Sequence, residues 1–169
     1  MALVDLENPT AIRDHRLLGL FQFWHGLSRG RRMPASADLD AADLARWADN
    51  LMLVDVPGDI LDFRIRSLGA AVAAMFGTPR AGTGIEAMTS EGERNSIIPQ
   101  YRVVIDTGLP AYYETEVELS NRGVIHQRKL LLPLSDDAKR VNAVLAGIYH
   151  DPPRKGRARL TTRGKATRP

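Results

Sequence analysis

The amino-acid sequence predicts an α+β fold: one five-stranded antiparallel sheet with helices on one face and an additional N-terminal helix. Three strand-like runs, at residues 111–119, 124–134 and 140–149, follow one another with only short polar turns between them, as in antiparallel hairpins. Two further strand-like runs lie upstream, and helical patterns occupy the segments around them. Numbered along the chain, the five strands are expected in the spatial order 2-1-5-4-3.

The segment 111–119 shows the clearest strand pattern. Its residues alternate, with Tyr113, Thr115, Val117 and Leu119 on one face and Tyr112, Glu114, Glu116 and Glu118 on the other. An alternation of period two is typical of a strand with one buried face, here the face of Tyr113. We expect the glutamates to be solvated rather than catalytic, because a general acid or base needs a partly buried position that shifts its pKa.

An N-terminal helix is expected from Thr10, a favourable N-cap residue, as far as the basic segment 29–34. Its apolar residues recur at helical spacing and form one stripe: Leu17, Leu20, Phe21, Trp24 and Leu27. An apolar stripe of this width must be buried. We therefore expect the helix to pack on the sheet or on the same helix of a second chain, giving a homodimer with Leu17, Leu20, Phe21 and Trp24 at its interface.

A short helix and a strand hairpin come next. Asp40 is the expected N-cap of the helix. The apolar run 50–56 predicts a buried strand, and the alternating residues 61–67 predict its hairpin partner. On this second strand we expect Arg64 and Arg66 to be exposed, because they alternate with apolar residues.

Residues 68–107 are expected to cover one face of the sheet as helices. Ser67 should cap a short first helix, and a capping box predicts a second helix from about Glu91. Pro99 should kink or break this second helix. The segment 78–90 between the two is irregular and contains glycine, so it can move without disrupting regular structure.

Composition excludes several classes of function. The chain of 169 residues has no cysteine, which rules out disulfides, thiolate metal ligands, cysteine nucleophiles and a cysteinyl–flavin adduct. Its four histidines lack metal-ligand spacing, and there is no phosphate-binding loop or nucleophile elbow. Because there is also no long apolar run and no secretory signal pattern, we expect a cytoplasmic protein that does not span a membrane.

The positive charge is concentrated at the C-terminal end. The net charge is +3, but residues 154–169 contain seven basic residues and no acid, so residues 1–153 carry a net charge of −4. We expect residues 151–169 to be a disordered, solvated tail, because they contain few apolar groups. Weak binding to nucleic acid or acidic lipid is the alternative, although no aromatic residue is interleaved to stack on bases.

Several short motifs occur in a characteristic order over about residues 15–150. They are Trp24, Arg32-Met33-Pro34, Asp38-Leu39-Asp40, Phe63-Arg64, Gly69, Phe76-Gly77 with Gly82, Tyr101 to Val104 with Gly108 and Pro110, and Lys129-Leu-Leu-Leu-Pro-Leu-Ser-Asp-Asp137. This order resembles the PAS domain family, in particular an alphaproteobacterial subfamily that begins with a Trp-containing helix. Lys129 stands where the subfamily pattern has arginine, and Ala138 where it has a turn glycine. We expect these differences to affect only the surface and a hairpin turn.

Candidate ligand contacts lie between the sheet and the helices at 68–107. They are Phe63, Met75, Phe76, Tyr101, Val104, Tyr113, Thr115 and His126. Such residues are core residues in most sheet-and-helix folds, so a plain core and a ligand-sized cavity both stay open. A ligand there should be mostly apolar or aromatic with one or two hydrogen-bonding atoms. No particular cofactor is predicted, and haem is not expected, because the helix at 91–107 has no histidine.

The sequence divides into an N-terminal helix extension at 1–34, a PAS-like domain at 35–150 and the basic tail at 151–169. The resemblance implies a non-catalytic sensory or regulatory domain that binds a small molecule, a signalling partner protein, or both. We expect its output to pass through a partner or through self-association. Two alternatives stay open: an adaptor or nucleic-acid-associated protein that acts through the basic tail, and an enzyme with a site in the same pocket.

Overall fold

The computed structural model describes residues 1–58, 63–76, 82–84, 91–119 and 123–151, and its main feature is a six-stranded antiparallel sheet. The strands are β1 (Ala2–Leu3), β2 (Leu51–Asp55), β3 (Arg64–Leu68), β4 (Ala111–Leu119), β5 (Gly123–Leu134) and β6 (Ala143–His150). The helices are α1 (His15–Leu27), α2 (Ala41–Leu44), α3 (Ala70–Phe76) and α4 (Glu91–Thr107), with 3₁₀ helices η1 (Ser36–Asp38) and η2 (Ala45–Asn50). Within the described ranges, no helix is long and apolar enough to cross a membrane.

The strands lie in the order β1-β4-β5-β6-β2-β3, each antiparallel to its neighbours. With β1 set aside, this is the predicted 2-1-5-4-3 order, so the predicted α+β fold is confirmed. The sequence did not predict β1, whose two residues pair with Tyr112 and Ala111 at the edge of β4. A strand of two residues is too short to show an alternation in a sequence.

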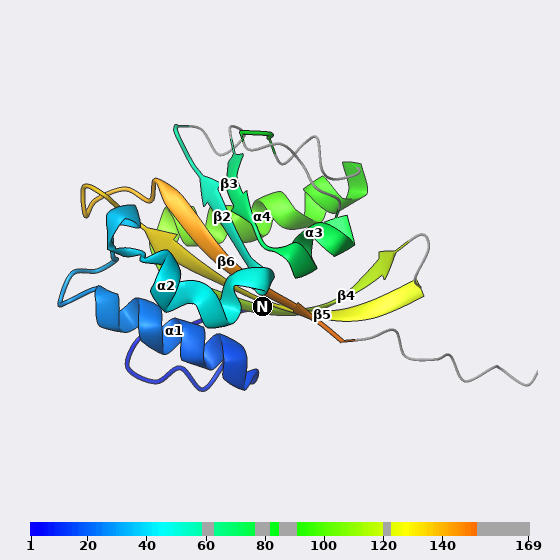
Figure 1. The fold of residues 1–169 in the computed structure, drawn as a ribbon, viewed down its shortest axis with the longest axis horizontal. Helices are drawn as coiled ribbons and strands as arrows, with labels where there is room; N and C mark the ends of the chain where they lie inside the picture. The colour runs from blue at the N-terminus through cyan, green and yellow to red at the C-terminus, as the bar shows by residue number, and fades with distance from the viewer. Residues whose placement is uncertain (59–62, 77–81, 85–90, 120–122, 152–169) are drawn as a thin grey trace, which may run out of the picture.

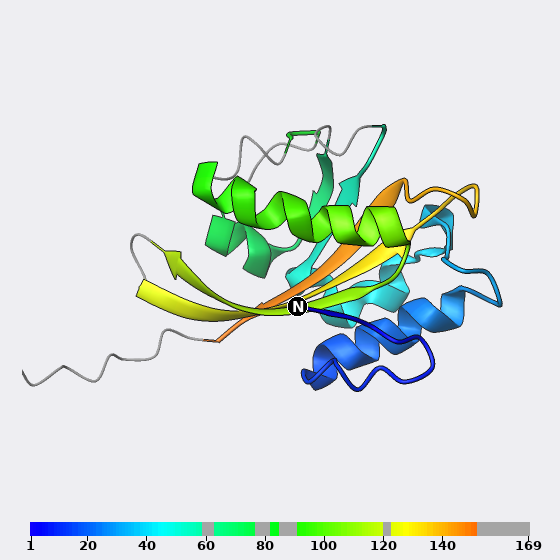
Figure 2. The same ribbon diagram turned by 180° about the vertical axis from the view of Figure 1, so that it is seen from behind.

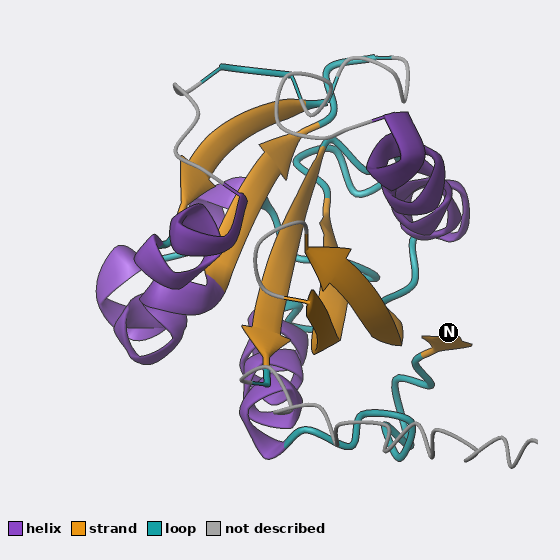
Figure 3. Ribbon diagram, turned by 90° about the vertical axis from the view of Figure 1, so that its right-hand side faces the viewer, coloured by secondary structure: helices purple, strands orange, loops and turns teal. Residues whose placement is uncertain are grey.

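Helices lie on both faces of the sheet. α4 crosses one face, which we call the inner face, and α1 crosses the other, the outer face (Figures 1 and 2). Figure 3 shows the strands between these helices. The Tyr113 hydroxyl donates to the Gln100 carbonyl of α4 at 3.2 Å, which identifies the inner face. β5 is covered on both sides, and its residues Leu130, Leu131 and Leu132 are fully buried.

α1 packs its apolar stripe on the outer face of the chain's own sheet. Leu17, Leu20, Phe21 and Trp24 are buried, and the Trp24 indole N–H donates to the Pro133 carbonyl at 2.9 Å. A Cβ atom on Gly147 would come within 2.7 Å of Leu17 and Leu20, so this glycine lets the helix approach the sheet. Packing on the sheet is therefore the outcome observed. The four side chains are buried within the single chain, and the homodimer stays a prediction.

The N-cap of α1 is Asp14 rather than the predicted Thr10. Its carboxylate accepts hydrogen bonds from the backbone N–H groups of Arg16 and Leu17. Asp40 caps α2 as expected, through the backbone N–H of Ala42. Both residues satisfy N–H groups that the first turn of a helix leaves unpaired. A threonine side chain can also accept such a hydrogen bond, but Asp14 additionally pairs with Arg16 and Arg128.

The end of β3 also differs from the prediction. Ser67, the expected cap of α3, pairs with Leu53 inside the β2–β3 hairpin, and α3 begins only at Ala70. The turn between them is made by Gly69. A Cβ atom there would come within 2.5 Å of the carbonyl oxygens of Ala48 and Asp49, which a larger residue cannot tolerate.

α4 is one helix that contains Pro99, so of the two predicted alternatives the break is wrong and the kink stays a prediction. The helix ends as expected at Gly108, whose φ of 61° lies in the left-handed region. The N–H of Gly108 donates to the Val104 carbonyl at 2.8 Å and closes the last turn. The predicted irregular segment at 78–90 and the basic tail lie mostly outside the described residues.

Candidate functional site

A cluster of polar side chains lies on the inner face, where β4, β5 and β6 run side by side. One cross-strand row holds Tyr113, Lys129 and Ile148, and the next holds Thr115, Gln127 and His150. Directly paired residues of neighbouring strands share a face, so both rows lie on the side covered by α4. Lys129 and Gln127 are almost completely buried, with 4% and 5% of their surface exposed.

The members of this cluster are only partly paired with one another. The Gln127 amide N–H donates to Nε2 of His150 at 2.8 Å. The Lys129 ammonium lies 5.8 Å from the centre of the Tyr113 ring, near the outer limit of a cation–π contact. Among the described residues, none of the ion pairs includes Lys129. Buried lysine without an anionic partner is uncommon in proteins, because the lost hydration is not replaced.

Burial sets the charge states of the cluster. It lowers the pKa of Lys129 to about 8, because a poorly hydrated ammonium favours its neutral form. Burial, reinforced by the charge of Lys129, lowers the pKa of His150 to about 4. At neutral pH the lysine is therefore still charged and the histidine neutral. The cluster carries one positive charge in a poorly hydrated position.

Aromatic side chains contact α4 on the same side of the sheet. The ring centres of Phe63 and Tyr101 are 5.1 Å apart, and both residues are buried, as is Val104. The Tyr101 hydroxyl is buried without a hydrogen-bond partner in the described part of the chain, and burial raises its pKa well above the ordinary value. An unpaired buried hydroxyl costs about 1–3 kcal/mol, so its presence requires an explanation.

The structure brings most of the predicted ligand contacts to this side of the sheet. Phe63, Tyr101, Val104 and Tyr113 are buried at α4, and Thr115 shares the inner face. Met75 is half-buried on α3, and the side chain of Phe76 lies outside the described residues.

His126 is separated from the other predicted contacts. It pairs with Glu116, which places it on the outer face, and its Nδ1 lies 3.5 Å from the Asp151 carboxylate. His126 was predicted among the ligand contacts with Tyr113, and this prediction is wrong, because the two residues lie on opposite faces of the sheet. A shift of one residue exchanges the two faces of a strand.

The sequence-based prediction did not include Gln127, Lys129 or His150, and it expected the Lys129 difference to concern the surface. The available signal was the alternation along β5, where Gln127 and Lys129 share a face with the buried Ile125 and Leu131. That signal was weak because residues 126–129 are polar on both faces of β5 and residues 130–134 are apolar on both. A strand covered on both sides does not alternate between polar and apolar residues.

Comparison with known families gives the chain its classification. The sequence pattern of a family described as PAS domain matches residues 12–149, which is most of the chain. The chain belongs to the PAS domain family. The comparison with curated proteins found no match.

Several solved structures are similar to this PAS domain. The PAS domain of a protein from Colwellia psychrerythraea is 10% identical, with coverage of 68% of this chain and 100% of that chain and a TM-score of 0.49. A Rhodobacter sphaeroides LOV protein is 14% identical, with coverage of 69% and 62% and a TM-score of 0.45. The LOV domain of a blue-light activated histidine kinase from Erythrobacter litoralis is 14% identical, with coverage of 59% and 93% and a TM-score of 0.45.

Several motifs that indicated the PAS family hold loops in place in this domain. The Arg32 guanidinium donates to the Thr107 carbonyl at the end of α4. The Pro34 carbonyl accepts a hydrogen bond of 2.9 Å from the Ser135 N–H at the end of β5. Ala138 has a φ of 58°, the left-handed conformation that favours glycine, as expected for its position in the hairpin turn. These residues position the loops at the ends of α4 and β5.

A network of ion pairs on the outer face joins β5 of the PAS domain to the start of α1. The Asp14 carboxylate pairs with Arg16 at 2.6 Å and lies 3.4 Å from Arg128 of β5. Arg128 also donates to both carboxylate oxygens of Asp151, at 3.0 and 2.7 Å. Burial opposes the ionisation of Asp14, but the hydrogen bonds and charge of Arg16 outweigh it and lower its pKa to about 2. The network ties two chain segments to the strand that carries Lys129.

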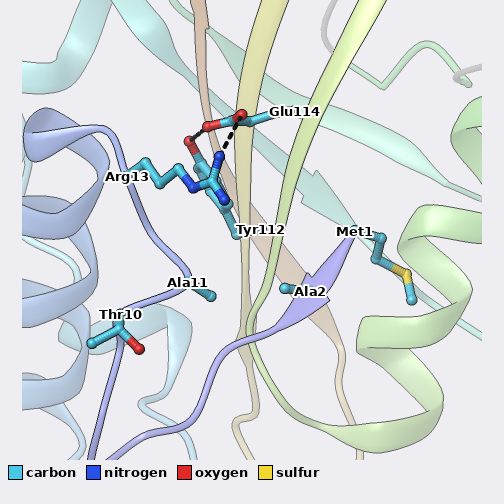
Figure 4. A pocket seen from close by; sticks show the side chains of 7 residues that line it. All are labelled: Met1, Ala2, Thr10, Ala11, Arg13, Tyr112 and Glu114. Carbon is cyan, nitrogen blue, oxygen red and sulfur yellow. Dashed lines mark hydrogen bonds and ion pairs between the residues drawn. The ribbon is translucent and has the colours of Figure 1, made fainter.

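The outer face also has a shallow, open pocket of about 270 Å³ beside β1 (Figure 4). It is lined by Met1, Ala2, Thr10, Ala11, Arg13, Tyr112 and Glu114. The Tyr112 hydroxyl donates to Glu114 at 2.7 Å, and Arg13 lies 4.0 Å from the same carboxylate. Of the glutamates expected to be solvated, Glu116 is exposed, whereas Glu114 is partly covered. Across the described ranges, no three potential metal ligands are grouped.

Proposed function

We propose that this PAS domain is a non-catalytic sensory or regulatory domain that holds a small molecule beneath α4, on the inner face of the sheet. The Tyr101 hydroxyl carries the proposal, because it is buried and has no partner among the described residues. A ligand that exchanges one hydrogen bond with this hydroxyl would remove the cost of leaving it unpaired. Phe63 and Val104, both buried, supply apolar contacts for the body of such a ligand.

We propose that β5 transmits ligand binding from the inner face to the outer face. Lys129 faces the inner side, whereas its neighbour Arg128 holds Asp14 and Asp151 on the outer side. A ligand that shifts β5 changes the contacts at the start of α1 and at the end of β6 together. A partner protein that binds this outer surface with different affinity in the two states would receive the signal.

Native mass spectrometry of the purified protein tests the proposal, because it reports bound molecules and oligomeric state together. The wild type should carry a small molecule. Val104→Trp, which adds bulk one helical turn from Tyr101, should lose that molecule while its circular dichroism spectrum is retained. Arg102→Trp, at an exposed position of the same helix, is the matched control and should retain it.

Tyr101→Phe is a second test that does not depend on whether Val104→Trp folds. It removes only the hydroxyl, so the variant should fold with unchanged or higher stability and retain less of the molecule. A wild-type protein that carries no molecule, and whose unfolding temperature no compound in a metabolite library raises, would reject the proposal.

A further inference from the structure

Lys129 is a second buried polar residue on the inner face, and the ligand proposed for the Tyr101 hydroxyl does not account for its positive charge. It is 4% exposed, lies between Tyr113 and Ile148, and has no ion-pair partner in the described part of the chain. The polar groups that share its face of the sheet in the same and the adjacent row are Tyr113 and Thr115 from β4, Gln127 from β5 and His150 from β6. None of these four is anionic at neutral pH. A counter-ion from outside these elements would stabilise the buried ammonium.

We infer that the inner face binds a small organic monocarboxylate with an aromatic or apolar body, whose carboxylate pairs with Lys129. The inference rests on the proposed function and names the ligand class for the same site. It makes the sequence-based expectation of a mostly apolar or aromatic ligand with one or two hydrogen-bonding atoms more specific.

The positive charge of Lys129 and the N–H donors of Gln127 favour a monocarboxylate over other anions. Lys129 supplies one positive charge, and His150 is neutral at pH 7, so one negative charge completes the site while a phosphate dianion would leave an excess. The Gln127 amide uses one of its two N–H groups on His150. In the inferred complex, the second N–H would donate to the other carboxylate oxygen. The rings of Phe63 and Tyr101 favour a planar, apolar body.

Binding of an anion should depend on pH in one direction. The pKa of Lys129 is about 8 in the free protein, and a bound carboxylate would raise it. The affinity is therefore constant below about pH 8, where the lysine is already protonated. Above that pH it falls by up to about tenfold per pH unit, because binding then requires uptake of a proton.

Isothermal titration calorimetry of the full chain with matched probes tests the inference. The probes are phenylacetate with phenylacetamide and octanoate with octanamide, which differ mainly in charge. At pH 7 at least one carboxylate should bind about tenfold more tightly than its amide, a difference of about 1.4 kcal/mol. That preference should shrink at pH 9. If neither carboxylate binds better than its amide, the inference is overturned.

Variants at position 129 identify the group responsible. Lys129→Met should lose the preference for the acid, and Lys129→Arg, which keeps the charge, should retain it. Lys139→Met, at an exposed lysine, is the control and should behave as the wild type. A preference for carboxylates that persists in Lys129→Met would overturn the inference.

Two outcomes separate this inference from the proposed function. If wild-type protein carries a neutral molecule in native mass spectrometry, the sensor function stands and the anion class fails. If, with both proteins freed of bound molecules, Lys129→Met still unfolds at a lower temperature than the wild type, the lysine is paired within the protein itself, and the inferred anion site is overturned while ligand binding at Tyr101 is unaffected.

Discussion

The ammonium of Lys129 lies 5.8 Å from the centre of the Tyr113 ring, and none of the ion pairs in the described part of the chain includes this lysine. A cation–π contact contributes only about 1 kcal/mol, less than the cost of removing an ammonium from water. The pKa of Lys129 is accordingly about 8 in the folded protein, against 10.5 for an ordinary lysine. Between these values the unfolded chain binds a proton that the folded protein has released, so stability should rise with pH.

For protein freed of any bound molecule, we expect the free energy of unfolding to increase by about 2 kcal/mol between pH 7 and pH 9.5, measured by chemical denaturation. The range stops there because burial raises the pKa of Tyr101 and Tyr112, so ionisation of tyrosines in the unfolded chain lowers stability above about pH 10. Lys129→Met should be more stable than the wild type at pH 7 and lack the rise. Lys139→Met should keep it. A wild-type profile that is flat over this range would contradict the buried position of the charge.

Acid should destabilise the protein through His150. Its pKa is about 4 in the folded protein, against 6.5 for an ordinary histidine, so the unfolded chain binds the extra proton between these values. Stability should fall by about 2 kcal/mol as pH decreases from 6.5 to 4. His150→Gln should flatten this part of the profile, whereas His15→Gln, at an exposed position, should not. Equal acid sensitivity of the two variants would exclude His150 as the cause.

Asp14 and Thr10 provide a direct comparison of two candidate helix caps. Asp14→Ala should cost about 2 kcal/mol, because it removes the N-cap of α1 and a buried partner of Arg16. Thr10→Ala should cost less than about 0.5 kcal/mol, since Thr10 is exposed and caps no helix. Thermal unfolding of both variants measures the difference. A larger effect at Thr10 would mean that α1 starts earlier than described.

Trp24 should contribute strongly to stability and not to self-association. Trp24→Ala should cost about 3–5 kcal/mol, because the ring is fully buried and its N–H donates to the Pro133 carbonyl. Gln22→Ala, at an exposed position of the same helix, should change stability by less than about 0.5 kcal/mol. Sedimentation should give the same oligomeric state for wild type and Trp24→Ala. Dissociation of a wild-type dimer by this change would place Trp24 at an interface instead.

Replacing Ala138 by glycine should increase the stability of the protein. Its φ of 58° costs a residue with a Cβ atom about 1–2 kcal/mol, which glycine avoids at an entropic cost of about 0.5–1 kcal/mol. Ala138→Gly should therefore stabilise the protein by about 0.5 kcal/mol in chemical denaturation. Ala42→Gly, within α2, is the opposite control and should destabilise it. A loss of stability in Ala138→Gly would show that the turn is not strained.

The candidate site could be predicted only in part. Tyr101, Tyr113 and Val104 were predicted at the helix–sheet interface and are buried there, because aromatic and β-branched residues at strand and helix spacing are core residues in either interpretation. Gln127 and Lys129 were not predicted. A lysine in a sequence is normally a surface residue, and its burial depends on α4 and on the register between β4 and β5.

The sequence by itself determined the type and order of the elements. The alternation at 111–119, the apolar stripe of α1 and the turn residues at Gly108 and Ala138 are local patterns, and each corresponds to a feature of the fold. The tertiary structure alone decided where α1 and α3 begin and that the polar residues Gln127 and Lys129 are buried. Asp14 caps α1 and also pairs with Arg128 of β5, and Lys129 is buried on the inner face, which α4 covers. Both outcomes depend on contacts between residues far apart in the chain, which local periodicity does not encode.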